Sequence, residues 1–207
     1  MEKLDLRKEL KHLYNPSAKA FQLIDVPSLQ FVMIDGQGDP NTAESFRLAM
    51  QALYTVSYTL KFDLKKNHGV DYPVMPLEGL WWADDMDLFS QEKKGEWKWT
   101  LMIMHPDVVS KKLFKSAVEQ VAAKKGLPAL GGLRLERLRE GKSAQILYLG
   151  PYADEGPTIA RMHAFIRESG YMPEGKHHEI YLGDPRRSAP EKLKTVIRQP
   201  VKHQGKG

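Results

Sequence analysis

Two segments of the chain resemble each other closely, and only one of them has a carboxylate in the middle of the expected strand. They are residues 79–84, with the sequence GLWWAD, and residues 179–184, with the sequence EIYLGD. Side chains alternate between the two faces of a β-strand, so Gly79, Trp81, Glu179 and Tyr181 are expected on one surface. Leu80, Trp82, Ile180 and Leu182 are expected on the opposite, core-facing surface. The first surface is a candidate pocket with one acid, two large aromatic rings and a glycine that leaves room.

Glu179 suits two kinds of chemistry. A carboxylate beside aromatic rings attracts a planar lipophilic cation through charge and cation–π interactions, together worth about 1 to 3 kcal/mol when partly desolvated. The same group can act as a general base toward water if apolar neighbours raise its pKa. The structural alternative is a surface acid on an edge strand, or an acid paired with Arg186 or Arg198.

Further polar and aromatic residues are weaker candidates. Tyr54 and Tyr58 lie four residues apart on an expected helix, so both hydroxyls can reach a groove, although packing is slightly favoured. Tyr148 is either a hydrogen-bond donor to a ligand carbonyl or a tyrosine at the edge of the core. Glu78 shares the face of Leu80 and Trp82. We keep Glu78 and Trp82 as secondary ligand-binding candidates.

Metal and cofactor sites are not expected. Adjacent strand residues point to opposite faces, so of the two histidines in His177-His178-Glu179 only His177 can join Glu179, and no third ligand has a useful spacing. The sequence contains no nucleophile elbow and no glycine-rich phosphate loop.

Composition narrows the class of protein. The chain has 207 residues, 42% of them hydrophobic, no cysteine and a formal net charge of +5. It can bury a substantial core, and disulfides and thiolate metal sites are excluded. The basic residues alternate with leucines and glutamates, so nucleic acid is not an expected partner. With no long apolar run and a polar amino terminus, we expect a cytoplasmic protein without a membrane partner, either a monomer or a weak homodimer.

The same order of elements is expected twice. A helix over Leu4–Tyr14 precedes the first unit. The first unit has a hairpin of residues 21–26 and 29–35 that turns at Pro27-Ser28, a helix starting at a capping box of Asn41 and Glu44, and strands Leu80–Ala83 and Trp97–Met104. The second has a hairpin of residues 133–138 and 144–149 around Glu140-Gly141-Lys142, a helix over Thr158–Ser169 closed by Gly170, and strands His178–Leu182 and Lys194–Arg198. A helix from about Val108 to Lys125 joins them.

This order predicts one α+β domain. Its fold is a pseudo-two-fold tandem of two strand-helix-strand-strand units that share an antiparallel sheet, with helices on one face and a ligand groove between the halves. The units span about residues 20–106 and 131–201, the linker helix about 107–126, and a flexible tail 202–207.

Three segments carry a resemblance to a known family. Residues 177–187 (HHEIYLGDPRR), 194–201 (KTVIRQPV) and 76–82 (PLEGLWW) closely resemble stand-alone proteins of the GyrI-like, or gyrase-inhibitor-like, small-molecule-binding superfamily. The resemblance spans nearly the whole chain. It implies the two-unit fold and binding of lipophilic, often cationic, drugs in a central groove beside a buried glutamate, which Glu179 matches by position.

The resemblance leaves two functions open. Some stand-alone members that this chain resembles are cyclopropanoid cyclopropyl hydrolases, which hydrolyse cyclopropane-bearing DNA-alkylating antibiotics. In that case Glu179 activates or orients water, Tyr181 or Tyr148 polarises the substrate carbonyl, and Trp81 stacks on its planar body. Alternatively the same residues sequester or sense a drug without turnover. Too few residues precede Phe21 for a helix-turn-helix domain, which disfavours a transcription regulator.

Overall fold

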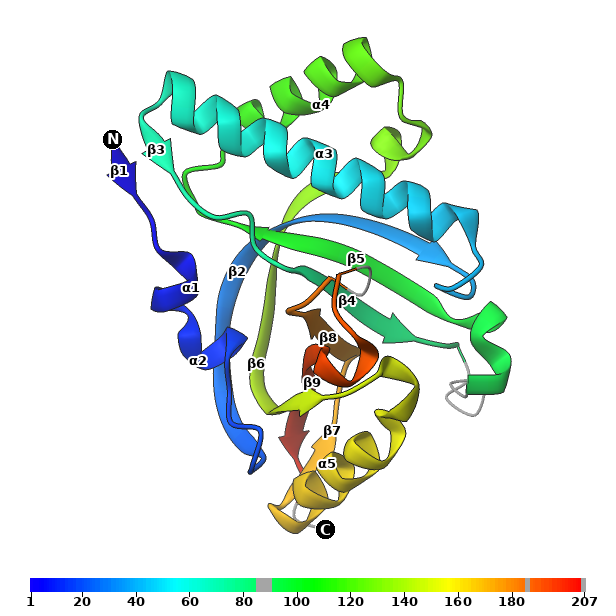
Figure 1. Cartoon of the computed structure of the whole chain (residues 1–207). Helices are drawn as coiled ribbons and strands as arrows, with labels where there is room; N and C mark the ends of the chain where they lie inside the picture. Colours follow the sequence, from blue (N-terminus) through cyan, green and yellow to red (C-terminus); the bar gives the residue numbers. More distant parts are fainter. Residues whose placement is uncertain (85–90, 185–186, 206–207) are drawn as a thin grey trace. The chain divides into compact units, whose positions relative to one another are not determined.

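The structure is a computed structural model of the whole chain, in which residues 1–84, 91–184 and 187–205 are described. The chain forms two compact units, whose main helices and strands are labelled in Figure 1. Unit 1 consists of Met1–Glu9 and Leu29–Leu138, and unit 2 consists of Leu10–Ser28 and Arg139–Gly207. Each unit contains a long strand, a helix, a short strand and two further strands, in that order along the chain. The repeated order of elements and the α+β class are therefore confirmed.

Unit 1 is built around one central strand. Its elements are β2 (Gln22–Gln37), of which residues 29–37 belong to this unit, α3 (Glu44–Asn67), β4 (Leu77–Trp82) and β5 (Lys98–His105). Strand β5 is antiparallel to β2, with Ile34 opposite Leu101, and antiparallel to β4, with Gly79 opposite Leu101. Seven of the eight residues of β5, from Trp99 to His105, are buried, as expected for a strand covered on both faces.

Helix α3 has one apolar face, and this face is buried. The buried hydrophobic positions follow helical spacing: Phe46, Ala49, Ala52, Leu53, Val56, Leu60 and Leu64. The predicted capping box is wrong, because the helix starts at Glu44 and its N-cap residue, Ala43, has no side-chain hydrogen bond. Asn41 donates its amide to Asp39 Oδ1 at 2.8 Å instead. This helix is therefore stabilised by packing of its apolar face and not by a side-chain cap at its N-terminus.

Smaller elements complete unit 1. The helix expected from Val108 is α4 (Lys111–Lys125), which starts where Ser110 Oγ accepts from the Leu113 amide and ends at Gly126 in the left-handed conformation. Strands β1 (Glu2–Lys3) and β3 (Val70–Asp71), both missed from the sequence, pair in parallel. The remaining elements are α1 (Leu6–Glu9), η2 (Gln91–Glu96) and η3 (Pro128–Gly132).

Unit 2 repeats the arrangement of unit 1. Its elements are α2 (Lys11–Tyr14), β6 (Arg134–Leu149), of which residues 139–149 belong to this unit, η4 (Tyr152–Asp154), α5 (Gly156–Glu168), β7 (Tyr171–Pro173), β8 (His177–Tyr181), η5 (Pro190–Lys192) and β9 (Lys194–His203). The central strand β9 is antiparallel to β6, β8 and β7. Helix α5 contributes Met162 and Ile166 to a core that includes Ile146, Ile197 and Val201. The predicted tail is partly wrong, since Lys202 and His203 continue β9.

The two units match in register as well as in order. Ile34 lies opposite Leu101 in unit 1, and Ile146 lies opposite Ile197 in unit 2. Across the next strand pair, Gly79 lies opposite Leu101 and Glu179 opposite Ile197. Gly79 and Glu179 therefore hold equivalent positions, and so do Trp81 and Tyr181, as the sequence comparison predicted.

Both predicted hairpins are wrong, and for the same reason. The regions around Pro27-Ser28 and Glu140-Gly141-Lys142 lie inside the 16-residue strands β2 and β6. Pro27 is exposed, where a missing amide hydrogen is tolerated. Gly141 has a φ of 66°, so it bends the strand locally without reversing it. The single long helix predicted over Leu4–Tyr14 is divided into α1 and α2 at Leu10.

A buried ionic cluster connects three segments of unit 2. Glu140 contacts Arg198 Nη1 at 3.1 Å and His178 Nδ1 at 2.9 Å, and the three side chains are 5%, 2% and 0% exposed. Arg198 also donates to the Leu13 carbonyl and the Gln145 amide oxygen. Burial alone would raise the pKa of Glu140, but the His178 imidazole and the Arg198 guanidinium outweigh it and lower that pKa to about 2.

We predict that Glu140→Gln destabilises the protein by about 3 to 5 kcal/mol, because the variant leaves the Arg198 guanidinium buried without its counter-charge. Urea denaturation at pH 7 measures the loss. Glu136→Gln is the matched control on the same strand, since Glu136 is 56% exposed and should cost about 1 kcal/mol or less. Equal effects of the two substitutions would contradict the structural role of the cluster.

Candidate functional site

The candidate site lies on one face of β8. Alternation along this five-residue strand places His177, Glu179 and Tyr181 on one side and His178 and Ile180 on the other. His178 and Ile180 are fully buried, whereas Glu179 and Tyr181 are partly exposed. Within unit 2, the predicted division into a core face and a polar face is confirmed for Glu179, Ile180 and Tyr181, whereas Leu182 lies beyond the strand and is partly exposed.

Both carboxylate oxygens of Glu179 are hydrogen-bonded. His177 Nε2 lies 3.0 Å from Oε1, and the Tyr181 hydroxyl donates to Oε2 at 2.8 Å. Burial would raise the pKa of Glu179, but the bonds from His177 and Tyr181 outweigh it and lower that pKa below its ordinary value. Glu179 is therefore ionised at neutral pH although its side chain is only 16% exposed.

Glu155 supplies a second carboxyl group beside the first. It immediately precedes α5, it is 3% exposed, and its carboxyl hydrogen-bonds Glu179 and lies beside the Thr195 hydroxyl of β9. Burial and the negative charge of Glu179 raise the pKa of Glu155. Two carboxyl groups this close cannot both ionise at low cost, so the pair holds one proton at neutral pH, on Glu155.

Two oxygen atoms at this pair are buried without a well-placed hydrogen-bond partner. Among the described residues, Glu155 Oε1 and Thr195 Oγ1 have no hydrogen-bond partner of good geometry. Buried polar atoms in native proteins are usually paired, so two unpaired oxygen atoms beside an acid pair mark a candidate site. The acid pair therefore offers an ionised acceptor, a protonated carboxyl and an unpaired hydroxyl.

Tyrosines surround this acid pair. The ring of Tyr152 meets that of Tyr181 edge to face, with centroids 5.5 Å apart. Tyr148, predicted as a donor to a ligand carbonyl, donates its hydroxyl to the Pro151 carbonyl at 3.1 Å. It thus holds the segment that leads to Tyr152, and a direct role toward a ligand would require that bond to break.

The unit 1 candidates lie in a different environment. Trp81 is 5% exposed, stacks on Phe46 of α3 at a centroid distance of 6.0 Å and meets Trp97 edge to face. The room that Gly79 leaves is filled by Trp81 itself, since a Cβ at position 79 would lie 2.7 Å from the indole Nε1. The expected division of faces is wrong here, because Trp81 is the more deeply buried and Trp82 is partly exposed. Helix α3 covers the face that the sequence suggested for a ligand.

The other candidates differ in how far their side chains are exposed to solvent. Glu78 is 1% exposed on β4. Tyr54 and Tyr58 are 37% and 47% exposed on α3, where Tyr58 stacks on Phe62. Both tyrosines line a groove between α3 and α4, whereas Glu179 belongs to unit 2. Arg186, named as a possible partner of Glu179, lies outside the described residues, and the ion-pair partner of Arg198 is Glu140.

Sequence reasoning missed Glu155. Its position before Gly156-Pro157 marks the start of a helix, but no spacing pattern connects it to Glu179 on a strand that follows that helix. Within the described residues there is no group of three or more histidine, aspartate or glutamate side chains placed to hold a metal ion. Likewise, none of the described helices is both long and apolar enough to cross a membrane.

We predict that Glu155→Gln changes the pH dependence of stability. The pKa of Glu155 is raised from 4.5 to about 9, so the folded protein keeps a proton that the unfolded chain releases. Between these values the free energy of unfolding falls as pH rises, by up to about 1.4 kcal/mol per pH unit for one group. Glutamine removes this contribution.

Urea denaturation at pH 5, 7 and 9 should therefore show a smaller loss of stability toward alkaline pH in Glu155→Gln than in the wild type. Glu168→Gln, at the exposed end of the same helix, is the control and should follow the wild type. Parallel pH profiles for Glu155→Gln and the wild type would show that Glu155 is ionised in the folded protein.

Comparisons with known proteins agree with this fold. None of the curated proteins compared with the chain matches it. An uncharacterized conserved protein from Listeria innocua is 37% identical with a TM-score of 0.90, over 96% of this chain and 100% of that one. A hydrolase from Listeria innocua is 36% identical with a TM-score of 0.85, over the same shares of the two chains.

A more distant structure shares the fold alone. The C-terminal domain of EcmrR is 10% identical, with a TM-score of 0.56, over 89% of this chain and 98% of that domain. Residues 19–202 match the GyrI-like family, which is described as a small molecule binding domain. This match covers most of the chain, including both repeated units. The chain therefore belongs to the GyrI-like small-molecule-binding domain family.

Proposed function

We propose that this protein is a hydrolase of lipophilic small molecules whose reactive carbon is part of a strained ring, with cyclopropane-bearing alkylating compounds as the substrate class. The observation that carries the proposal is the pair of Glu155 and Glu179, which shares one proton beside the unpaired hydroxyl of Thr195. The 36% identity to a hydrolase over nearly the whole chain supports the same reaction type.

The chemistry assigns one role to each carboxyl group. Glu179 accepts a proton from water as the water oxygen forms a bond to the ring methylene carbon. The strained carbon–carbon bond breaks, and its electron pair moves through the conjugated system to the carbonyl oxygen of the substrate. That oxygen takes up a proton from solvent, and Glu179 releases its own. The net change is the addition of one water molecule to the substrate.

Glu155 acts on this reaction through Glu179. A neutral Glu155 hydrogen-bonds the Glu179 carboxylate and holds it in place, whereas an ionised Glu155 would repel it. Glu155 is thus a positioning residue. The edge-to-face rings of Tyr152 and Tyr181 provide an apolar wall beside the acid, against which the planar part of a substrate can pack.

A second function is favoured by one specific observation. The hydrogen bonds from His177 and Tyr181 lower the pKa of Glu179, which weakens it as a base and keeps it charged. A fixed negative charge next to aromatic rings suits binding of lipophilic cations without turnover. In this alternative the protein sequesters or senses such compounds, and Glu179 acts only as their counter-charge.

We predict that Glu179→Gln lowers the rate of ring opening of a cyclopropane-bearing alkylator by at least about 100-fold, because glutamine cannot accept the proton of water. The ring-opened product is measured by mass spectrometry after incubation with purified protein. Glu174→Gln, at a carboxylate that is 53% exposed in the same unit, should retain full activity. A wild-type rate in Glu179→Gln would overturn the catalytic role, and no turnover by the wild type would leave binding as the function.

We also predict a preference for cations at this site. Ionised Glu179 should favour a lipophilic phosphonium or acridinium cation over a neutral molecule of the same shape by about tenfold, equivalent to about 1.4 kcal/mol. Isothermal titration calorimetry of matched cationic and neutral ligands measures the ratio. Glu179→Gln should bring the ratio close to one and leave the neutral ligand's affinity unchanged. A preference that survives this substitution would place the cation elsewhere on the molecule.

A further inference from the structure

Helix α3 carries a second stripe of large apolar side chains, which is exposed. Tyr54, Tyr58 and Phe62 follow one another at intervals of four residues and are 37%, 47% and 58% exposed. Tyr58 and Phe62 stack with their ring centroids 6.2 Å apart. The buried face of α3, which packs within unit 1, has a separate apolar stripe. Exposed aromatic side chains gathered on one helix face are typical of an interaction site.

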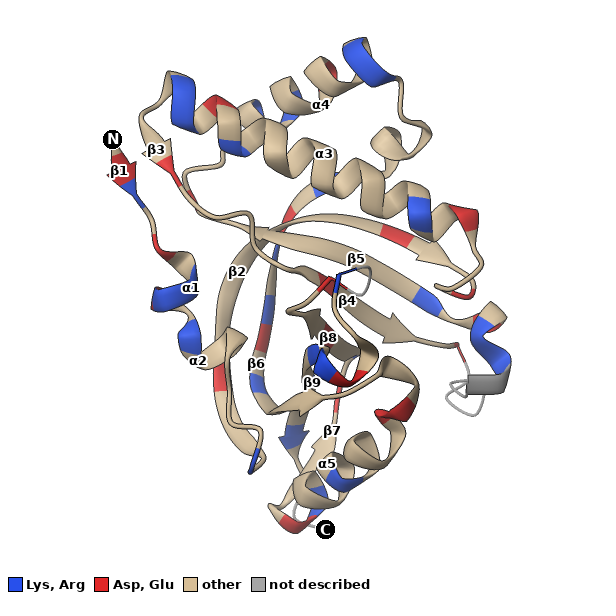
Figure 2. Cartoon of the chain, viewed as in Figure 1, with Lys and Arg blue, Asp and Glu red and all other residues tan. Residues whose placement is uncertain are grey.

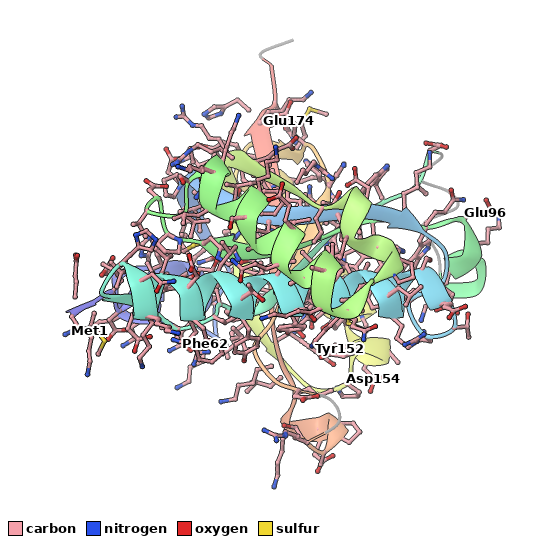
Figure 3. The ribbon with its side chains drawn as sticks, turned by 90° about the horizontal axis from the view of Figure 1, so that it is seen from above. Met1, Phe62, Glu96, Tyr152, Asp154 and Glu174 are labelled. Carbon is pink, nitrogen blue, oxygen red and sulfur yellow. The ribbon has the colours of Figure 1, made fainter. Side chains whose placement is uncertain are left out.

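Helix α4 forms the opposite wall of a groove along this stripe. Figure 3, which looks down on the two helices, shows them side by side and labels Phe62 on α3. The wall on α4 consists of Gln120, Val121, Lys124 and Lys125. The groove encloses about 320 Å³, near the lower limit for sites that bind small organic molecules.

The charge of the groove is positive. Its lining contains Lys124 and Lys125 and no aspartate or glutamate. Among the described residues, neither lysine has an ion-pair partner, and Figure 2 shows this basic end of α4 next to the loop that leaves the helix. Two ammonium groups repel a cation and attract an anion, so the groove selects against the lipophilic cations proposed for Glu179.

The threonines of the groove do not compete for a ligand's acid group. The hydroxyl of Thr55 donates to the Gln51 carbonyl at 2.7 Å, and that of Thr59 donates to the Thr55 carbonyl at 2.8 Å. Both residues therefore use their hydroxyl protons within the helix. Lys124 and Lys125 supply the positively charged donors for an anionic group.

We propose that the α3–α4 groove binds a planar aromatic molecule that carries a carboxylate or sulfonate group. Its rings pack against Tyr58, Phe62 and Val121, and its acid group pairs with Lys124 and Lys125. This site is independent of the proposed hydrolase function, because it lies within unit 1 and selects for the opposite charge.

The test uses the full-length protein, with naphthalene-2-sulfonate as the anionic probe and 2-naphthylmethylammonium as the matched cation. Titration at 150 mM salt, followed through the NMR signals of α3 and α4, should show the anion binding the groove at least tenfold more tightly than the cation. The double variant Lys124→Glu and Lys125→Glu should reverse this preference. Phe62→Ser should weaken binding of the anion, and Glu179→Gln should leave the anion's affinity unchanged.

The control exchanges the same charges elsewhere on the same helix. Lys111→Glu with Lys112→Glu alters two exposed lysines in the first turn of α4 and should leave the affinity for the anion unchanged. Equal affinities for the two probes, or an unchanged anion affinity in the Lys124 and Lys125 variant, would overturn the proposal. Two further results would also overturn it: tighter binding of single-stranded oligonucleotides than of the probe, or a dimer that the Phe62 variant dissociates.

Discussion

Two carboxyl groups brought together out of water must share a proton, and this constraint governs the chemistry of unit 2. Ionising both Glu155 and Glu179 would place two negative charges side by side in a medium that screens them poorly. His177 and Tyr181 direct their hydrogen bonds to Glu179, so the charge resides there and the proton on Glu155. Residues of β8 therefore determine that Glu179 is the acid that can accept a proton. Glu155 keeps its proton and hydrogen-bonds Glu179.

The opposite face of the same strand shows how that arrangement is held in place. His178 is fully buried and contacts Glu140, which in turn pairs with Arg198 of β9. Because adjacent strand residues point in opposite directions, a shift of β8 by one residue would break both the ionic cluster and the acid pair. The buried cluster thus fixes the register of the strand that presents Glu179. Its contribution is structural, yet the geometry of the candidate site depends on it.

Features that depend on local periodicity were predictable from the sequence. The apolar face of α3, the helix closed by Gly170 and the alternation around Glu179 all follow from spacing alone. The hairpins failed because Pro27 and Gly141 are turn residues whose local preference was overridden by pairing along strands of 16 residues. Glu155 could not be found because its partner lies on another element, and nothing in its own segment distinguishes it from a solvated acid. Long-range contacts of this kind carry no local signal.

Equivalent positions in the two repeats have acquired opposite chemistry. Where unit 2 has Glu179, unit 1 has Gly79, and the space this glycine leaves is filled by the indole of Trp81. The partner of Trp81 on the central strand is the buried Trp99, whereas the partner of Tyr181 is Thr195, whose hydroxyl is unpaired among the described residues. Aromatic packing therefore stabilises this position in unit 1, whereas the same position in unit 2 has polar side chains. The repeated backbone explains why the two segments look alike in sequence, and the side chains explain why only the second is a candidate for catalysis.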